Sequence, residues 1–555
     1  KLLLAPVLVS TIDLLMPATE GTKGGKQIGA MLRLLTSDLV LDEPDDFGLK
    51  DLPALCRLVH WSGMLGSRVL LSTATMPPAL VYALFQAYKE GWGQYAKANI
   101  EKWSGKIVCA WFDEFTAKSD QYSDFIPFKE SHKKFVEKRI KSLNKNSSPK
   151  HKGEIITIEI EENSDTNFVI SSLAKVIQKS TIDLHQTHHQ SSGDKRVSIG
   201  LVRMANINPL VAVAKALLEL DAPENSTIHY CIYHSRYPLA IRSHLENKLD
   251  KILNRKDPTK IWDNPEIKSQ LEQHSQTDHI FIVLASPVAE VGRDHDYDWA
   301  IIEPSSMRSI IQIAGRVLRH RDITPTEPNI LLLNRNYSSL IGREVCFTRP
   351  GFEDKNLKLA SYDLQNILEQ KQYENINAIQ RIIRPNNLQD KKLYLNDQKQ
   401  LLNLVDLEHK ALEEQLIAGE EAAKIWWRED PHWCGEVQRQ QRFRDSQKDE
   451  AYYLWLTDQD SEEEWRWKNE AVYPSKFGDG TIKIIDDKIS TLGNGSYFWF
   501  DLSAKTIYYE LVKDLGLNIE EVSNFFGEVR LTEYNNQQSE YKYHPNFGLY
   551  QAPNN

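Results

Sequence analysis

An apolar run meets a group of carboxylates in Asp38-Leu39-Val40-Leu41-Asp42-Glu43-Pro44-Asp45-Asp46-Phe47. Such a short apolar run is typical of a buried parallel strand, and the acids follow where that strand would end. At a strand end, a first acid such as Asp42 can hold the Mg²⁺ of a bound nucleoside triphosphate. The neighbouring Glu43 can orient or deprotonate an attacking water. The alternative is an acidic surface loop, which is the better interpretation of an isolated Asp-Glu pair.

Small hydroxyl residues follow a second apolar run. They form the tetrapeptide Ser72-Thr73-Ala74-Thr75, which follows the apolar run Val69–Leu71 at the end of a predicted strand. Hydroxyl groups in this position can hydrogen-bond to an acidic strand-end cluster and to a neighbouring domain. The tetrapeptide alone is common. Its place after the acidic strand end makes it informative.

Size and composition set broad limits. A chain of 555 residues is too long for one core and predicts about three or four domains. The hydrophobic content of 41% suits a globular protein, and we expect no membrane span and no signal peptide. Five widely spaced cysteines indicate a reducing cytoplasm rather than a disulfide framework or zinc ribbon. With a net charge of −10, the chain must hold any polyanion through local basic patches.

The first region, residues 1–128, alternates short apolar strands with helical stretches, a βαβ rhythm. Four strands are predicted, at Val7–Ile12, Leu39–Leu41, Val69–Ser72 and Ile107–Phe112. The chain begins at Lys1 with neither an initiator Met nor a targeting pattern. We therefore expect it to be the C-terminal part of a longer polypeptide.

A glycine-rich basic loop, Glu20–Gln27, is not a phosphate-binding loop. Its glycine spacing is one residue short of G-x-x-x-x-G-K, and Gln27 stands where a Mg²⁺-binding Ser or Thr is needed. We predict that Lys23 and Lys26 contact nucleic acid, and a plain flexible loop is nearly as plausible. Residues 129–153 are also basic, with nine Lys or Arg against two Glu. They indicate a solvated helix plus linker, or contact with a DNA or RNA backbone.

Residues 154–345 predict a second α/β unit. Its strands are expected at Ile155–Ile160, Val197–Met204, Ile228–Tyr233, His279–Ala285, Trp299–Glu303 and Asn329–Leu333. Helices are expected between them, including Pro209–Leu220 and Ser309–Leu318. Residues 346–450 are expected to be mainly helical, with Leu401–Trp427 as the clearest amphipathic helix. Residues 451–555 predict a small α+β domain whose aromatic residues form a core or, less commonly, stack on single-stranded bases.

Three groups of residues in the second unit indicate a site. His234-Ser235-Arg236 and the run Glu290–Asp294 each follow a predicted strand. On a continuous helix, Gln312, Arg316 and Arg319 would share one face, since they are spaced i, i+4, i+7. Paired arginines on one face suit a triphosphate, because guanidinium groups stabilise charge on the γ-phosphoryl group. An ordinary basic helix face would not explain Gln312 and Gly315.

Taken in chain order, several segments resemble the motifs of superfamily 2 helicases. Asp42–Asp45 is similar to motif II, Ser72–Thr75 to motif III, the run Glu290–Asp294 to motif V, and Gln312-x-x-Gly315-Arg316-x-x-Arg319 to motif VI. Thr11-Ile12-Asp13 resembles the motif Ib/Ic region, and His234-Ser235-Arg236 the motif IV region.

A more specific resemblance is to the type I-F CRISPR-associated helicase–nuclease. It rests on Thr11–Thr19, Asp42–Phe47, Tyr233–Arg236 and the accessory C-terminal region. That family degrades DNA already opened by a CRISPR RNA-guided surveillance complex. It contains an adaptation-protein fusion domain, an HD nuclease, two RecA-like domains, a linker and a C-terminal domain.

The resemblance implies an α/β fold of tandem RecA-like domains. The first, incomplete at its N-terminus, would be residues 1–128, followed by the basic linker 129–153 and the second RecA-like domain 154–345. A helical linker region 346–450 and the accessory domain 451–555 would complete the chain. The implied partners are single-stranded DNA, the surveillance complex, adaptation proteins, and an upstream polypeptide that carries the phosphate loop and the nuclease with its divalent metal.

The resemblance also implies residue roles. ATP would lie between the two RecA-like domains, with Asp42 as the Mg²⁺ ligand, Glu43 positioning water, and Gln312, Arg316 and Arg319 completing the catalytic set. Asp45, Ser72, Thr73, Thr75, Gly292 and Asp294 would contact the nucleotide or relay its state. The predicted nucleic-acid contacts are Thr11, Asp13, Lys23, Lys26, Arg203, His234, Ser235 and Arg236. Backbone contacts of this kind carry affinity without sequence information.

The sequence departs from the family because it has no G-x-x-x-x-G-K-[ST] and no nuclease signature in a suitable context. His295-Asp296 matches the HD dipeptide by accident. We therefore expect this chain alone to be inactive and the full-length protein to be an ATP-dependent DNA helicase with nuclease activity. The alternatives are another superfamily 2 RNA or DNA helicase and a non-catalytic fragment that docks on DNA or on the surveillance complex.

Overall fold

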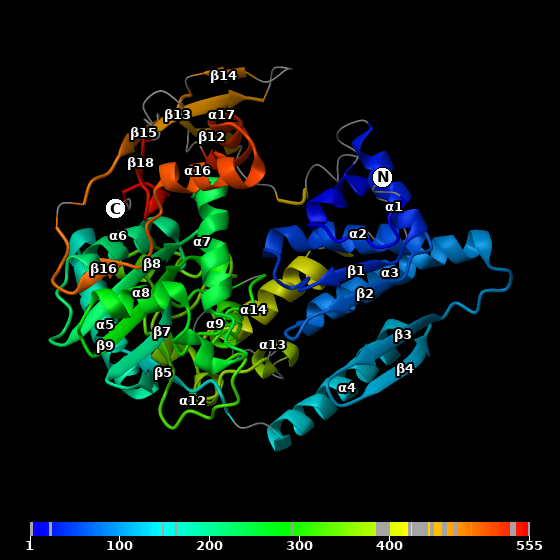
Figure 1. Ribbon diagram of the computed structural model, residues 1–555. Helices are drawn as coiled ribbons and strands as arrows, with labels where there is room; N and C mark the ends of the chain where they lie inside the picture. Colours follow the sequence, from blue (N-terminus) through cyan, green and yellow to red (C-terminus); the bar gives the residue numbers. More distant parts are fainter. Residues whose placement is uncertain are drawn as a thin grey trace. The chain divides into compact units, whose positions relative to one another are not determined.

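The computed structural model divides the chain into two compact units, each assembled from separate segments (Figure 1). The first comprises Lys1–Ser148, Phe352–Ala360 and Ala378–Asp445, and the second comprises Pro149–Gly351, Ser361–Asn377 and Ser446–Asn555. The residues that the structure describes are 4–20, 25–146, 149–160, 164–290, 292–384, 400–419, 423–424, 442–444, 449–457, 463–470, 476–478, 480–489, 491–532 and 540–552. The domain boundaries expected from the sequence stay predictions.

The first unit is built around two short parallel strands and the helices beside them. β1 (Leu39–Asp42) pairs with β2 (Val69–Ser72), and α2 (Leu52–Met64) connects them. α2 packs closely against α3 (Pro78–Asn99), since a Cβ at Gly91 would lie 2.0 Å from the His60 carbonyl oxygen. Only glycine permits that approach.

Further elements of the first unit lie before, after and far along the chain from this pair. β3 (Ile107–Phe112) and β4 (Ala117–Tyr122) form a separate antiparallel hairpin, followed by α4 (Phe125–Asn146). The remaining elements are η2 (Ile12–Leu14), η3 (Met16–Ala18), α1 (Lys26–Thr36), η4 (Leu49–Asp51), α13 (Ile379–Ile382), α14 (Leu404–Glu413) and the π-helical turn η8 (Glu414–Ala418). Residues 378–418 therefore belong to the first unit, although they follow most of the second in sequence.

The strand predicted at Val7–Ile12 is wrong. The described residues of this segment form no strand, and only Ile12 enters a regular element, the 3₁₀ turn η2. Val7 and Val9 are 77% and 92% exposed. Apolar alternation indicates a strand only where a neighbouring strand supplies hydrogen bonds, and β1 pairs with β2 alone in the described part of this sheet.

An eight-stranded sheet forms the centre of the second unit. Its order is β16-β8-β9-β7-β10-β11-β5, with β6 (Gln190–Ser192) added antiparallel to β7. The other neighbours are parallel. The strands are β5 (Gly153–Ile156), β7 (Lys195–Arg203), β8 (Ser226–Tyr233), β9 (Asp278–Ala285), β10 (Trp299–Ile302), β11 (Ile330–Leu333) and β16 (Ser496–Phe498). The strand predicted at Ile155–Ile160 ends early, at Ile156.

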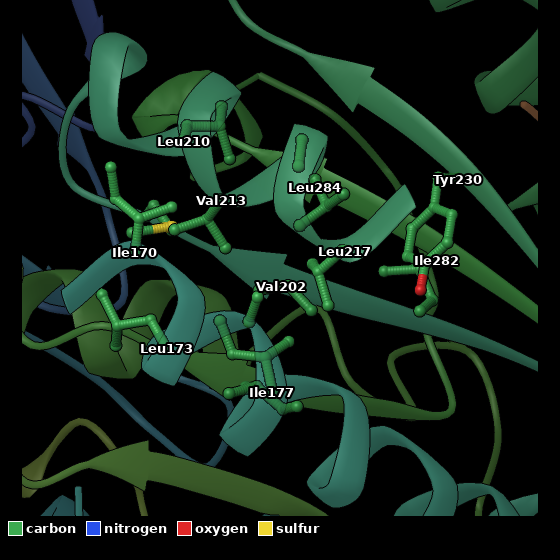
Figure 2. Packing of buried hydrophobic residues seen from close by; sticks show 14 of the residues in the cluster. Ile170, Leu173, Ile177, Val202, Leu210, Val213, Leu217, Tyr230, Ile282 and Leu284 are labelled. Carbon is green, nitrogen blue, oxygen red and sulfur yellow. The ribbon is translucent and has the colours of Figure 1, made fainter. Parts of the chain in front are cut away.

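Helices cover this sheet, and their apolar faces make its core (Figure 2). Ile170, Leu173 and Ile177 of α5 (Thr166–His188) pack with Leu210, Val213 and Leu217 of α6 (Ile207–Leu218) and with Val202, Ile282 and Leu284 of the sheet. These side chains recur every three or four positions along each helix. The central strands β7, β8 and β9 are near-continuous runs of buried residues, as expected for a parallel sheet.

Further helices of the second unit lie between the strands or follow β11. They are α7 (Leu239–Ile252), η5 (Pro258–Ile261), α8 (Pro265–Gln273), η6 (Pro287–Ala289), α9 (Met307–Ala314), α10 (Tyr337–Leu340), α11 (Leu364–Ile367) and α12 (Gln370–Tyr373). The helix predicted over Ser309–Leu318 is too long, because α9 ends at Ala314.

The C-terminal region combines two small sheets with two helices. One antiparallel sheet has the order β14-β13-β12-β17, and a second has the order β15-β18-β19. The elements are β12 (Asp449–Leu456), β13 (Glu463–Asn469), β14 (Lys476–Gly478), β15 (Lys483–Asp486), α16 (Ala504–Leu515), α17 (Ile519–Phe526), β17 (Glu528–Thr532), β18 (Glu540–His544) and β19 (Gly548–Tyr550). β16 leaves this region and pairs with β8 at the edge of the large sheet.

The predicted α/β class is confirmed, because helices and a large parallel sheet make up the second unit. No helix among the described residues is both long enough and apolar enough to cross a bilayer.

Candidate functional site

The acids after β1 and the hydroxyl residues after β2 meet at one edge of the two-stranded sheet. The two strands run parallel and in register, with Asp42 opposite Ser72. Both segments therefore leave the sheet at the same end. The Glu43 backbone N–H donates to the Ser72 carbonyl oxygen at 2.7 Å, and Glu43 has a left-handed φ of 48°. This turn directs the following acids back toward β2.

Two threonine hydroxyls bind these acids. Thr73 Oγ1 lies 2.7 Å from Asp45 Oδ1 and 3.0 Å from Glu43 Oε2. Thr75 Oγ1 donates to Asp45 Oδ2 at 2.7 Å. The structure thus brings together Glu43, Asp45, Thr73 and Thr75, as the sequence suggested for a site at adjacent strand ends. We call these four residues and Asp42 the acid cluster.

Asp42 differs from Asp45 in its exposure. The Asp42 side chain is exposed at the end of β1, and the opposite residue, Ser72, is also exposed, whereas Asp45 is buried. An accessible carboxylate with a nearby hydroxyl matches the oxygen ligands and retained waters that Mg²⁺ prefers. The residues present therefore fit a magnesium ion at Asp42, while Asp45 is held by the fold.

Two residues that the sequence did not indicate, Arg381 and Glu408, form buried ion pairs next to Asp45 of the acid cluster. Arg381 Nη2 of α13 is 3.7 Å from Asp45 Oδ2, and Arg381 Nη1 is 3.0 Å from Glu408 Oε2 of α14. All three side chains are nearly fully buried, and the guanidinium carbon of Arg381 lies 5.7 Å from the Phe352 ring centroid. The available signal was weak: an arginine close to three isoleucines within residues 379–383.

A second candidate group lies in the second unit, where the segment after β9 meets the segment after α9. Arg316 donates to the Arg293 carbonyl oxygen and, through Nη2 at 2.9 Å, to the Glu290 carbonyl oxygen. Arg319 Nε donates to Asp294 Oδ1 at 2.6 Å. Burial opposes ionisation of Asp294, but hydrogen bonds from Arg319 and His320 outweigh it and lower its pKa. Gly292 is exposed and left-handed, with φ 72°.

The predicted common helix face of Gln312, Arg316 and Arg319 is wrong. Gln312 lies on α9 and is half-buried, but Arg316 and Arg319 follow the helix end at Ala314. The chain leaves the helix because Val317 forms a bridge with Tyr297 and Leu318 takes a left-handed φ of 50°. Contacts with Glu290, Arg293 and Asp294, rather than helical periodicity, bring the two arginines to the same segment.

Two residues predicted to contact nucleic acid, Arg203 and His234, are buried and bind other groups of the protein. Arg203 is fully buried and donates from Nε to Glu290 Oε1 at 2.7 Å, and also to the Glu303 carbonyl oxygen and to the Ser305 and Ser309 hydroxyls. A guanidinium enclosed in this way cannot reach a strand. We therefore assign Arg203 to the fold and correct the earlier expectation.

His234 is corrected for the same reason. It is fully buried, its Nδ1 accepts from the Arg236 N–H at 3.1 Å, and its Nε2 therefore carries the proton and donates to the Phe547 carbonyl oxygen at 2.8 Å. Burial lowers the pKa of His234 to about 3, against the opposing hydrogen bond to Phe547. The neutral ring connects the segment after β8 to the C-terminal residues.

Four other predicted nucleic-acid residues have exposed or half-buried side chains. Ser235 and Thr11 are exposed. Arg236 is half-buried, donates to Asn208 Oδ1 at 2.9 Å and lies over the Tyr541 ring. Asp13 is exposed and pairs with Arg444 at 3.4 Å. Lys23 falls outside the described residues, and Lys26 begins α1.

A family described as "CRISPR-associated nuclease/helicase Cas3, C-terminal" matches residues 196–322. The match begins in β7 and ends just after Arg321, so it includes the Glu290–Asp294 segment and both arginines. The solved structure of T. fusca Cas3 with ATP is also similar, at a TM-score of 0.40 and 17% identity over 61% of this chain and 35% of that one.

Two curated relatives match along the whole sequence. The CRISPR-associated nuclease/helicase Cas3 subtype I-F/YPEST of Pectobacterium atrosepticum is 45% identical over 100% of this chain, and that of Pseudomonas aeruginosa is 40% identical over 99%. The chain spans 50% of each relative's length. The resemblance inferred from the motifs is therefore confirmed, and the chain is related over its whole length to one half of the subtype I-F CRISPR-associated nuclease/helicases.

Proposed function

We propose that this chain is the ATP-driven motor portion of a CRISPR-associated nuclease/helicase that moves along single-stranded DNA. The observation that carries the proposal is the hydrogen bonding of Thr73 to both Glu43 and Asp45 at adjacent strand ends. An arrangement in which hydroxyls fix two carboxylates beside an exposed Asp42 suits nucleotide hydrolysis, where catalysis is mainly positioning and electrostatics. The two curated relatives, named as nuclease/helicases, support the same assignment.

Each member of the acid cluster has a proposed role. Asp42 would hold Mg²⁺, which when bound neutralises charge on the phosphate oxygens. Glu43 orients the attacking water, and its side chain is kept in place by Thr73. Asp45 is too buried to meet the nucleotide and instead orients Thr73 and Thr75.

The two arginines of the second unit differ in what they can reach. Arg316 is engaged with two backbone carbonyls, so we assign it to shaping the segment 290–294 as well as to binding phosphate. Arg319 is 42% exposed and pairs with an exposed carboxylate. An exposed ion pair of this kind is weak, so Arg319 can exchange Asp294 for another anion. Arg319 is therefore the stronger candidate for contact with the γ-phosphate.

Single-stranded DNA would be bound through its phosphates by accessible groups, with Arg236 as the best-placed described cation. Its guanidinium is supported by Asn208 and Tyr541, so little side-chain entropy is lost on binding. We further propose that the chain works with an upstream polypeptide that supplies the phosphate loop and nuclease, and with a CRISPR RNA-guided surveillance complex and adaptation proteins, in the cytoplasm.

Phosphate release in the presence of single-stranded DNA tests the proposal. This chain alone should release none, because its sequence lacks a phosphate loop. Joined to the N-terminal portion of a full-length relative, it should hydrolyse ATP with a dependence on DNA. Asp42→Ala should abolish that activity, whereas Asp120→Asn, a change at an exposed strand carboxylate outside the cluster, should not.

The alternative of a non-catalytic docking module makes a different prediction. In that case the joined protein would bind DNA but release no phosphate, and Asp42→Ala would change nothing. Robust hydrolysis by the isolated chain would instead mean that a phosphate-binding loop lies elsewhere in it.

A further inference from the structure

We propose that Arg381 is a positioning residue for ATP hydrolysis, acting on Glu43 through Asp45 and Thr73. This inference rests on the proposed function of the acid cluster. Arg381 lies more than 300 positions after Asp45 in sequence, yet both belong to the first unit. It is outside the segments that resemble helicase motifs.

The first step concerns the single proton of the Thr73 hydroxyl. Thr73 Oγ1 is within hydrogen-bond distance of carboxylate oxygens of both Glu43 and Asp45. Its oxygen also accepts the Thr75 N–H at 3.2 Å, which fixes the position of the hydroxyl. A hydroxyl has one proton to donate, so at any moment it serves one carboxylate or the other.

The second step concerns the charge of Asp45. A buried carboxylate accepts hydrogen bonds from the donors near it, because these bonds compensate the free energy lost when water is removed. Thr75 donates to Asp45 Oδ2, and Arg381 places its positive charge 3.7 Å from the same oxygen. Because Thr75 and Arg381 compensate the charge of Asp45, Asp45 does not need the Thr73 proton at all times. The Thr73 hydroxyl can then donate to Glu43.

The third step concerns how Arg381 is held. Glu408 of α14 binds its other nitrogen at 3.0 Å, and Phe352 packs against the guanidinium. The planar fork of an arginine can contact two carboxylates at once, whereas a lysine ammonium is a single point charge. Arg381 therefore links the position of α14 to the acid cluster, and α14 packs on α3 within the same unit.

The expected consequence of losing Arg381 is a lower kcat for ATP with an unchanged KM, because nucleotide binding does not depend on the orientation of Glu43. Arg381→Met should lower kcat about 100-fold, the loss expected for a catalytic group misplaced by roughly 1 Å. In a Thr73→Val background the same change should have little further effect, since both act through one hydroxyl.

The experiment uses the chain joined to the N-terminal portion of a relative and measures kcat, KM and thermal melting for each variant. Arg381→Met removes the positive charge beside Glu408 and Asp45 and lowers the melting temperature. The double variant Arg381→Met/Glu408→Gln removes one of these charges, and should regain stability without regaining kcat. Arg381→Lys keeps the charge and the fold, and should give a kcat between those of wild type and Arg381→Met. Arg384→Met/Glu413→Gln, which removes a neighbouring ion pair outside the acid cluster, is the matched control and should keep wild-type kcat.

The outcomes are separable. Wild-type kcat in both Arg381→Lys and the double variant would overturn the positioning role and leave Arg381 as part of the core only. A parallel loss of kcat and rise of KM, or additivity with Thr73→Val, would also overturn it. If the unaltered joined protein shows no hydrolysis that Asp42→Ala abolishes, the proposed function fails, and the loss is not assigned to Arg381.

Discussion

Arg203 Nε lies 2.7 Å from Glu290 Oε1, and both side chains are buried at the start of the segment that Arg316 contacts. Ser309 of α9 donates to the other Glu290 oxygen at 3.1 Å, so the pair joins β7, α9 and the segment after β9. A buried ion pair with this many hydrogen bonds fixes local structure, and removing one partner leaves an uncompensated charge.

Arg203→Met should therefore destabilise the second unit. We expect a loss of about 3–5 kcal/mol in the free energy of unfolding, measured by chemical denaturation, with single-strand binding by the folded fraction unchanged. Arg466→Met, which removes a partly exposed arginine paired with Glu464, should cost less than about 1 kcal/mol. Weaker binding at unchanged stability would restore Arg203 as a nucleic-acid contact.

Arg316→Ala and Arg319→Ala should both abolish ATP turnover in the joined protein and leave single-strand binding largely intact. Their effects on stability should differ, since Arg316 binds two backbone carbonyls and Arg319 forms an exposed ion pair. Arg319→Ala should change the unfolding free energy by less than about 1 kcal/mol. Phosphate release and thermal melting measured on the same preparations check both statements. Wild-type hydrolysis in both variants would contradict the assignment.

Arg236→Ala should weaken DNA binding by a similar factor for every sequence. If the guanidinium meets one phosphate, the slope of log affinity against log salt should become shallower by about one unit. Titrations at several salt concentrations with two unrelated oligonucleotides measure this, and Arg466→Ala provides a control with unchanged slope. A loss confined to one oligonucleotide would indicate base recognition instead.

His234 should make stability depend on pH. Its pKa is about 3 in the folded protein and has its ordinary value near 6.5 when unfolded, so the unfolded state binds the extra proton between these values. The stability that the neutral ring contributes is thus complete above about pH 6.5 and is lost as the pH falls, by at most about 1.4 kcal/mol per pH unit. Unfolding at pH 7 and pH 5 should show wild type losing more stability than His234→Gln. Equal losses would mean that the ring is not buried and neutral.

The strand-end site was predictable because its signals are local. An apolar run ending in acids and another ending in hydroxyls suffice to place Glu43, Asp45, Thr73 and Thr75 together once the strands are parallel. The end of α9 was not predictable, because contacts of Val317 and Arg316 with distant segments overrode helical spacing.

The burial of Arg203 and His234 could also not be predicted from the sequence. Each looks like a basic residue at a strand end, and only the positions of Glu290 and Phe547 make it structural. Arg381 was missed for the opposite reason: its partner Asp45 is remote in sequence, and no spacing connects them. Ion pairs between residues that are far apart in sequence produce no periodic pattern along the chain.

The pairing of β16 with β8 has a consequence for synthesis. β8 is made long before Ser496–Phe498 emerges, and at about 5–20 residues per second the interval is on the order of tens of seconds. During that time the backbone groups along one side of an apolar strand face no partner, which is the condition under which sheet edges associate between chains. A ribosome-bound or prematurely terminated chain that lacks β16 should therefore aggregate more readily than one that includes it, because its β8 edge stays uncovered at residues 228–230.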